Sequence, residues 1–485
     1  MSVILNSISF NYKKNFLTPS QPFGYNFSQA SSCNLENLPI DLAAKITQNN
    51  SSDSLSGLSG KTIVIIGCSY GSGHKQAMAS TAEVVKKLGV KSILVDLPNE
   101  VLLEEDYARN LTRKYLGSFS PEWSTGDIFN FLMQRKAYSI INFISGNDPK
   151  ANRHPIAAPL DPRKVLKVHS YLSQFHPDAV VINYLPDIPT VIEVSRMLNI
   201  PVIHTHTDMN PRELCYKISS GCYDRFTECL PYSGFESILT STCLSPHQVV
   251  VSGPPCNSVF DTPLSSEEIE DKMKFYGISP DKKVIVISNG INGVSSTPPY
   301  IRFIHNRYKG QPKELIPFHL VVLCGKGNQT ICDNIHKKWS ELIPITALTS
   351  VEVAEMRDLM SIASQGGAML GKPGGLTVFE SLKLNVPLIF DSISPEIDYF
   401  NFSHTFWVLM NRGFQVLFGA SEIVPWESDN RDFIVENGLG YTCESEEKFH
   451  EILDLLSQQG IKKSVPSLKF SDEFPKILKQ CLLYD

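Results

Sequence analysis

Short apolar runs alternate with helical patterns along the chain, in two blocks separated by a polar stretch. Runs of this length, rich in Val and Ile, are typical of strands buried on both faces of a parallel sheet. The first block has them at 62–66, 92–97, 179–182, 201–204 and 249–251, and the second at 283–288, 319–325, 366–370 and 386–390. Helical spacing lies between them, at 76–88, 190–198, 349–364 and 376–384. The alternation predicts an α/β protein with two doubly wound parallel sheets.

The expected domain limits follow from where this alternation stops. Residues 1–60 are rich in Ser and Asn without sustained periodicity, which predicts a poorly ordered extension and linker. The polar stretch 262–281 marks the junction between the two blocks. We therefore expect a Rossmann-like domain over 61–262, a second over 263–440, and a C-terminal helical segment over 441–485.

Composition narrows the class of protein. A chain of 485 residues exceeds one typical core, and a net charge of −6 argues against a general nucleic-acid binder. Eleven cysteines without a Cys-x-x-Cys pair indicate reduced thiols. No apolar run reaches the ~18 residues of a membrane span, and the first lysines follow the N-terminal apolar part, unlike a secretory signal. We expect a cytoplasmic protein that is at most peripheral to a membrane.

The stretch Gly371-Lys372-Pro373-Gly374-Gly375-Leu376-Thr377-Val378-Phe379-Glu380 carries the strongest chemical signal. It joins a predicted strand to a predicted helix. Adjacent glycines let a ligand approach the backbone, and the unpaired N–H groups of a helix N-terminus suit a phosphate. Glu380 lies one helical turn further on, where it can accept hydrogen bonds from a sugar hydroxyl. The stretch predicts a site for a nucleotide-diphosphate sugar.

A second glycine turn, Gly71-Ser72-Gly73-His74, follows the first predicted strand. It lacks the third glycine of the dinucleotide fingerprint and is not a P-loop. It is either an ordinary tight turn or a loop that presents His74 at the carboxyl edge of the sheet, where a histidine can take a proton from an alcohol. Asp208 follows another strand at the same edge, and is either a base or an ordinary cap.

The segment 107–167 combines basic and apolar residues. It has ten basic and four acidic side chains, interleaved with aromatic and aliphatic ones. This pattern fits either docking on an anionic membrane surface or a core-facing helix with solvated charges on its far side.

A zinc site is also conceivable, because Cys215, Cys222 and Cys229 are evenly spaced near His204 and His206. Their spacing matches no ligand pattern, so we expect small buried residues and no metal.

The motifs resemble one family when they are taken together. In order and spacing, Tyr70–His74, Val95–Leu97, Thr207-Asp208, Val251–Pro255 and Gly371–Glu380 are similar to those of the monogalactosyldiacylglycerol synthases and the processive diacylglycerol glucosyltransferases, which are glycosyltransferase family 28-like. The resemblance covers roughly residues 61–450. It implies the GT-B fold, in which two Rossmann-like domains face each other across a cleft.

The resemblance also implies an activity and residue roles. The family transfers a hexose from UDP-glucose or UDP-galactose to a lipid hydroxyl such as that of diacylglycerol, with inversion, without a metal or another cofactor, at a membrane surface. By position, His74 and Asp208 would be catalytic, and Gly71, Ser72 and Gly73 would form the acceptor-side loop. The implied nucleotide-sugar site comprises Gly290, Gly293, Lys372, Gly374, Gly375, Leu376, Thr377, Glu380, Asp398 and Asn401.

Two positions depart from the family pattern. Ile397 stands where the family has the Gln expected near the donor sugar, and Cys256-Asn257 replace an Arg after Gly253-Pro254-Pro255. The donor sugar therefore stays open. Alternatives are a GT-B enzyme with another acceptor, a degenerate transferase that binds a nucleotide or a membrane, and a UDP-sugar epimerase.

Overall fold

The computed structural model describes residues 58–69, 72–106, 109–110, 113–114, 123–145, 160–211, 223–236, 244–288, 297–394, 402–421, 423–458, 465 and 468–483. Of the sequence expectations, those for residues 1–57, Gly71, Gly290, Gly293, Ile397, Asp398 and Asn401 lie outside these ranges.

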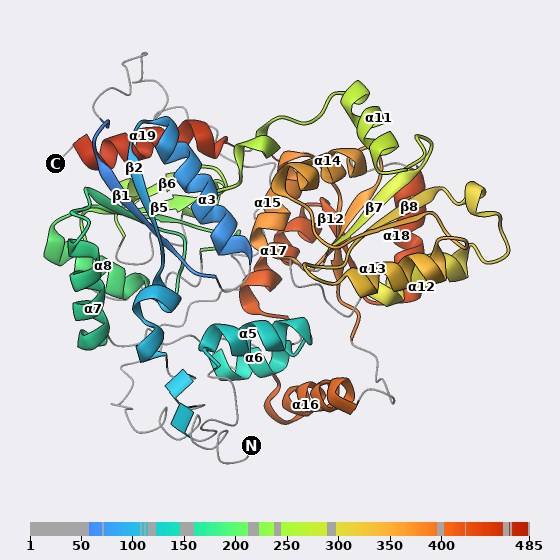
Figure 1. Ribbon diagram of the computed structural model, residues 1–485, viewed down its shortest axis with the longest axis horizontal. Coiled ribbons are helices and arrows are strands. Elements are labelled where there is room, and N and C mark those ends of the chain that lie inside the picture. Colours follow the sequence, from blue (N-terminus) through green and yellow to red (C-terminus); the bar gives the residue numbers. More distant parts are fainter. Residues whose placement is uncertain are drawn as a thin grey trace.

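Two six-stranded sheets, in which every pairing is parallel, organise the molecule (Figure 1). The first has the order β2-β1-β3-β4-β5-β6 and the second β12-β11-β10-β7-β8-β9. The strands of the first sheet are β1 (Thr62–Gly67), β2 (Lys91–Asp96), β3 (Ala179–Ile182), β4 (Val202–Thr205), β5 (Phe226–Leu230) and β6 (Val249–Val251). Those of the second are β7 (Lys283–Ser288), β8 (Phe318–Leu323), β9 (Ile345–Leu348), β10 (Ala368–Gly371), β11 (Leu388–Asp391) and β12 (Gly440–Cys443). This architecture confirms the predicted α/β GT-B fold with two Rossmann-like sheets.

Helices cover both faces of each sheet, because alternate strand residues point to opposite sides. In the first sheet, Val64 and Ile66 share a core with α7 (Pro162–Ser173) and α8 (Ile188–Leu198). Ile63 and Ile65 pack with α3 (Ser72–Lys87) and α19 (Phe470–Leu483). The C-terminal helix α19 therefore belongs to the first sheet.

The second sheet is covered in the same way. Ile285 and Ile287 pack with α12 (Thr297–Arg307), α13 (Gln329–Trp339) and α18 (Glu446–Gln458). On the other face, Val284 and Val286 join α14 (Val353–Ala363) and α15 (Gly375–Lys383). The strand β12 and helix α18 extend this unit beyond residue 440. The connection to the first sheet contains a 3₁₀ turn, Ser258–Asp261, and α11 (Ser266–Phe275).

Three helices form a smaller layer that joins the two sheets. The helices α5 (Thr125–Gln134) and α6 (Tyr138–Ser145) follow β2 in the chain, yet they pack against α16 (Phe402–Phe418) and the start of α17 (Pro425–Glu436). In Figure 1 these three helices lie together below the sheets. Leu132, Ile140 and Ile141 are buried against Phe414 and Val424. The apolar residues Leu132, Ile140 and Ile141 of segment 107–167 therefore make a core, as the second of the two sequence interpretations expects.

No helix in the described ranges has the length and apolar character needed to cross a bilayer.

Candidate active site

Both candidate loops lie at points where the strand order reverses direction. In the second sheet β7 and β10 are neighbours, and in the first sheet β1 and β3 are neighbours, with the chain winding away on either side. In open α/β sheets, ligands bind outside the carboxyl ends of the strands at such points. The glycine stretch follows β10 and His74 follows β1, so each stands at the position that this rule favours.

The helix α15 begins inside the glycine stretch. Gly374 is its N-cap and Gly375 its first residue, so its unpaired N–H groups and the positive end of its dipole are at this loop. The side chain of Leu376 is buried in the core, which leaves its backbone N–H as the group that it can offer a phosphate. Lys372 lies beside the loop, with its Nζ 3.0 Å from the buried carboxylate of Glu427 on α17.

The two adjacent glycines have different surroundings. A Cβ at Gly375 would lie 1.9 Å from the backbone O of Thr207 and 2.7 Å from Oδ1 of Asp208. A Cβ at Gly374 would meet only Cε of Lys372, at 3.7 Å. Gly375 is therefore required by the close approach of the other domain's backbone, whereas the space beside Gly374 is open.

One amide ties Asp208 to the phosphate-side loop. The Nδ2 group of Asn430, on α17, donates to Oδ1 of Asp208 (2.9 Å) and to the backbone O of Pro373 (3.0 Å). Its Oδ1 accepts from the backbone N–H of Met209 (2.7 Å). Asn430 is fully buried. The sequence gives no signal for this residue, because its contacts join segments that are far apart in the chain.

The ring of His74 is held in one tautomer. Its Nδ1 lies 2.6 Å from the backbone O of Asn183, at the end of β3. A carbonyl oxygen only accepts, so Nδ1 carries the hydrogen and Nε2 has the free lone pair. Burial lowers the pKa of His74, against the opposing effect of the Asp208 charge. The neutral imidazole that results can accept a proton through Nε2 at neutral pH.

The helix α3 begins at Ser72, four residues earlier than the sequence pattern suggests. Ser72, Gly73 and His74 are therefore the first helical turn rather than part of an open loop. The described members of the acceptor-side loop accordingly offer backbone N–H groups at a second helix N-terminus.

A buried cluster lies behind His74 and Asp208. His204 Nδ1 is 2.6 Å from Oε2 of Glu228, and His206 Nδ1 is 3.9 Å from Oε1. Burial lowers the pKa of His204 to about 3 and raises that of Glu228 well above its usual range, which indicates an uncharged pair. The ligand atoms of these three residues lie within 4.8 Å of one another, which gives this part of the described chain a geometry that could hold a metal ion. Cys229 packs on the opposite face of the strand, in the core, and Cys215 and Cys222 lie outside the described residues.

Glu380 is buried without a partner among the described residues, and burial raises its pKa to about 8. Its charge contributes to raising the pKa of the Cys256 thiol, whose main cause is burial, so the two side chains are near each other. Cys256 stands where the resembling family commonly has arginine. Lys383, one turn further along α15, pairs with Asp261 instead. The carboxyl group of Glu380 is thus uncharged at neutral pH and available to sugar hydroxyls.

The structure brings the described candidates to one place. His74 and Asp208 are close enough for the charge of Asp208 to influence the pKa of His74, and Asp208 contacts Gly375 and Asn430 at the start of α15. Thr377 is half-buried on the same helix. The sequence analysis missed Asn430 and Glu427, both of which reach this place from α17.

Comparisons with known proteins agree with the motifs. No protein-family model matches the chain. It is 24% identical over 339 residues to the processive diacylglycerol β-glucosyltransferase of Bacillus licheniformis, covering 68% of this chain and 76% of that one. It is 23% identical to the enzyme of the same name from Staphylococcus saprophyticus, covering 69% and 76%. The resemblance drawn from the motifs is thereby confirmed.

Two solved structures illustrate the similarity of fold. MurG of Acinetobacter baumannii matches with a TM-score of 0.44 and 13% identity, covering 82% of this chain and 91% of that one. UDP-GlcNAc 2-epimerase of Methanocaldococcus jannaschii matches with a TM-score of 0.45 and 12% identity, covering 86% and 98%. These superpositions are too loose to carry an argument about activity.

Proposed function

We propose that this protein is a glycosyltransferase that moves a hexose from a UDP-sugar to the hydroxyl of a diacylglycerol-type lipid, with inversion and without a metal ion. The observation that carries the proposal is the contact between Thr207-Asp208 of the first domain and Gly375 of the second. It puts a candidate acceptor-activating side chain beside a helix N-terminus suited to a pyrophosphate. Similarity to diacylglycerol glucosyltransferases supports the choice of acceptor.

The donor would bind on the second domain. Its pyrophosphate would lie over Gly374, where the space is open, and accept hydrogen bonds from the N–H groups of Gly375, Leu376 and Thr377. The ribose hydroxyls would donate to Glu380. The backbone donors and the dipole of α15 would stabilise the charge of the departing UDP, the task that a metal ion performs in other transferases. Gly290, Gly293, Asp398 and Asn401 are proposed for the same site on the resemblance alone.

The lipid acceptor would bind on the first domain, with its hydroxyl beside His74. His74 Nε2 would take the proton of the lipid hydroxyl as that oxygen attacks the anomeric carbon, and the bond from this carbon to the UDP oxygen would break on the opposite side. Asp208 would stabilise the imidazolium that forms. A single displacement of this kind inverts the anomeric centre. We place the reaction at the cytoplasmic surface of an anionic membrane, because the proposed acceptor is a lipid.

Incubation with UDP-glucose or UDP-galactose and diacylglycerol in anionic vesicles tests the proposal. We expect a glycolipid product, and loss of product with Glu380→Ala. No transfer from any common UDP-sugar would refute it. Calorimetric binding of UDP without turnover would indicate a degenerate transferase, the alternative that the departures at Ile397 and Asn257 favour. If only another lipid accepted the sugar, the acceptor would not be diacylglycerol. Epimerisation of UDP-N-acetylglucosamine without an acceptor would show that the protein is an epimerase.

A further inference from the structure

Lys136 occupies a backbone position that favours glycine. The helix α5 ends in a Schellman motif, in which the N–H of Ala137 donates to the backbone O of Leu132 (2.9 Å) and the N–H of Lys136 donates to that of Met133 (3.1 Å). With a φ of +50°, Lys136 is in the left-handed region, where glycine is usual because it has no Cβ. The backbone therefore gives no reason for a lysine here, and the reason lies with its side chain.

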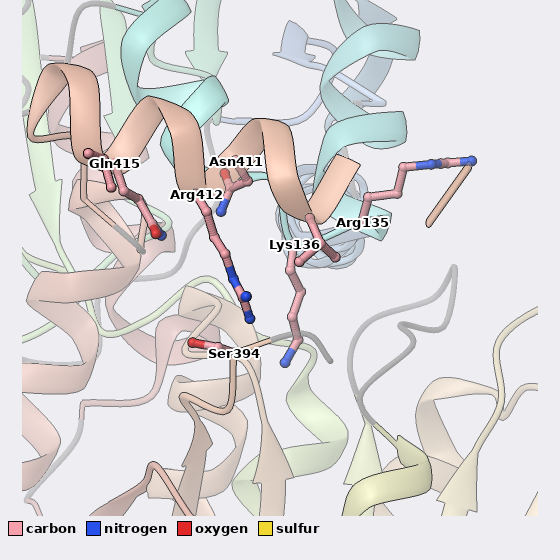
Figure 2. A pocket seen from close by; sticks show the side chains of 8 residues that line it. Arg135, Lys136, Ser394, Asn411, Arg412 and Gln415 are labelled. Atoms are coloured by element: carbon pink, nitrogen blue, oxygen red, sulfur yellow. The ribbon is translucent and has the colours of Figure 1, made fainter. Parts of the chain in front are cut away.

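The side chain of Lys136 is buried and ends at the second sheet. Its Nζ lies 2.7 Å from Oδ2 of Asp391 and donates to the backbone O of Ile393 at 3.0 Å, with exposed fractions of 6% and 2% for the paired side chains. In Figure 2 it extends toward Ser394, the next residue along. A residue from the chain between β2 and β3 thus holds the segment that leaves β11. Neither sequence interpretation of the basic residues in 107–167, a membrane-facing rim or a solvated face, describes this lysine.

Asp391 is also held from its own domain. The hydroxyl of Tyr300, on α12, donates to Oδ1 of Asp391 (2.9 Å), and the backbone N–H of Ile393 donates to the same oxygen (3.2 Å). The two carboxylate oxygens therefore have different partners, Oδ1 within the second domain and Oδ2 on Lys136. Because the partners are different, a substitution can remove the contact with the first domain and keep the others.

The held segment lies beside the glycine stretch. Strands β10 and β11 are neighbours, and one step beyond their last paired residues Asp391 stands next to Lys372 of the stretch. The charges of Glu427 and Asp391 add to burial in raising the pKa of Tyr138, so the Tyr138 hydroxyl, two residues after Lys136, is near both carboxylates. Glu427 is the partner of Lys372. The turn between α5 and α6 therefore reaches the carboxyl edge of the second sheet, where ligands of such sheets bind.

We propose that Lys136 is a positioning residue for the sugar of the donor, supplied to the second domain's site by the chain of the first. The inference rests on the proposed function, which places the pyrophosphate over Gly374 and the ribose at Glu380. The sugar is bonded to the end of the pyrophosphate opposite the ribose, and lies toward the ends of β10 and β11. Lys136 fixes residues 391–393 beneath it, and does so only while the two domains are together. It acts through this segment and not on the reacting atoms.

Two variants separate positioning from stability. Lys136→Met leaves the buried carboxylate of Asp391 unpaired, so it should lower the midpoint of thermal unfolding. Lys136→Met/Asp391→Asn removes both charges, and the Asn oxygen can still accept from Tyr300 and from the N–H of Ile393, so most of the stability should return. Both variants lack the hydrogen bond from Lys136 to the backbone O of Ile393.

Calorimetry with UDP and with UDP-glucose or UDP-galactose measures donor binding without an acceptor. We expect both variants to bind UDP as the wild type does, because UDP is held by α15. They should bind the UDP-sugar about tenfold more weakly, roughly the effect of one lost hydrogen bond. The ratio of the two dissociation constants should therefore change in both variants, although only the single variant is strongly destabilised.

A second buried pair provides a matched control. Lys383 and Asp261 are paired with exposed fractions of 5% and 8%, and Lys383 is the last residue of α15, at the end away from the glycine stretch. Lys383→Met/Asp261→Asn makes the same chemical change. It should leave the ratio of the dissociation constants for UDP-sugar and UDP as in the wild type.

Two results would overturn the inference. The first is a wild-type ratio in Lys136→Met/Asp391→Asn together with recovered stability, which would show that Lys136 only supports the fold. The second is the same change of ratio in the control. A wild type that binds the UDP-sugar but transfers it to no lipid would refute the proposed function and leave the role of Lys136 standing. Transfer by the wild type, with an unchanged ratio in both Lys136 variants, would do the reverse.

Discussion

His74 and Glu380 are both deeply placed titratable groups, and burial gives each the uncharged form at neutral pH. For His74 the consequence is a lone pair on Nε2 that can accept a proton, since Nδ1–H is committed to the carbonyl of Asn183. For Glu380 it is a neutral carboxyl group without a partner in the described structure. The two groups would change charge at different steps, His74 as the acceptor reacts and Glu380 as the donor binds.

Replacing His74 by Ala should reduce turnover about 10²–10⁴-fold, the usual effect of losing a general base. Affinity for UDP should stay the same, because His74 is on the other domain. Because the pKa of His74 is lowered from 6.5, the wild-type rate should be constant around pH 7 and fall only below pH 6.5, and the variant should lose this acid limb. Initial rates across pH and UDP titrations measure both. The variant His247→Ala, at an exposed site, is the control. A fully active His74→Ala variant would indicate that Asp208 is the base.

The buried carboxyl group of Glu380 should make the stability of the folded protein depend on pH. Its pKa of about 8 in the folded chain exceeds the ordinary 4.5, so the folded state holds a proton that the unfolded state loses between these values. The free energy of unfolding should therefore fall as pH rises from about 4.5 to 8. Glu380→Gln should remove this decline and be more stable than the wild type by roughly 3–5 kcal/mol at pH 8, since one pKa unit is worth about 1.4 kcal/mol. Denaturant titrations at pH 5 and pH 8 check it. Parallel curves for the two proteins would show that Glu380 is ionised in the free protein.

The sequence predicted these residues because they belong to local motifs. His74 and Glu380 each lie within a few residues of a strand end and a glycine turn, which the chain displays directly. Asn430 could not be predicted, because its hydrogen bond reaches Asp208, 222 residues away. The uncharged state of Glu380 could not be predicted either, since it results from burial of the carboxyl group, which depends on how distant segments of the chain pack together.

The N-terminus of helix α15 is closely packed on one side and open on the other. Gly374 and Gly375 are neighbours in sequence, yet one faces open space and the other faces the backbone of Thr207. The sequence motif treats them alike, as a place where a ligand approaches. In the structure, the group that approaches Gly375 closely is the backbone of Thr207, not a ligand.

Alanine at each glycine should separate the two roles. Gly375→Ala must push Thr207 away, so we expect a loss of about 1–3 kcal/mol in stability, as for other overpacked sites. Gly374→Ala has room and an N-cap conformation that alanine can adopt, so its stability should change by less than about 1 kcal/mol. Its methyl group would nevertheless stand where we place the pyrophosphate, and UDP should bind at least about tenfold more weakly. Thermal unfolding and UDP calorimetry on both variants test this. Normal UDP binding by Gly374→Ala would show that the pyrophosphate does not lie over Gly374.

Most of the strands that the sequence predicts are largely apolar and buried. The predicted strand at 283–288 coincides with β7, whose four central residues are apolar and buried. The pattern of apolar runs does not predict β5, β9 or β12. The sequence FTECL of β5 contains the buried Glu228, and GYTC of β12 is short and mixed in polarity. Edge strands such as β9 and β12 need to bury less of their surface, so their sequences carry less of the apolar signal.

At the scale of the whole molecule, the two Rossmann-like halves share one continuous core. Tyr232 and Phe235 of the first domain pack against Phe379 and Phe433 of the second, with ring centres 5.9 to 6.5 Å apart. Above this apolar contact the Asn430 amide joins Met209, Asp208 and Pro373. The structure is therefore held in a closed arrangement by apolar packing and by buried polar contacts, of which the Asn430 amide is one.

Removing that group should loosen the closed arrangement. Asn430→Ala leaves the buried N–H of Met209 without its partner, which costs about 1–3 kcal/mol. We expect lower stability, a larger radius of gyration by small-angle X-ray scattering, and a lower kcat/KM. Ser428→Ala is a matched control, because the Ser428 hydroxyl bonds to Asp432 and Arg431, which lie on the same helix α17. An unchanged radius together with unchanged kcat/KM would show that Asn430 does not control closure.

The position of α19 has a consequence for how the protein is made. Phe470 and Phe474 complete the core over Ile63 and Ile65, so one face of the first sheet is uncovered until α19 has been synthesised. The second sheet, by contrast, closes with β12 and α18, which emerge earlier. Domains usually mature in the order of translation. Here the half that is translated second would be finished first, and the nascent first half would need to be shielded from aggregation until α19 emerges.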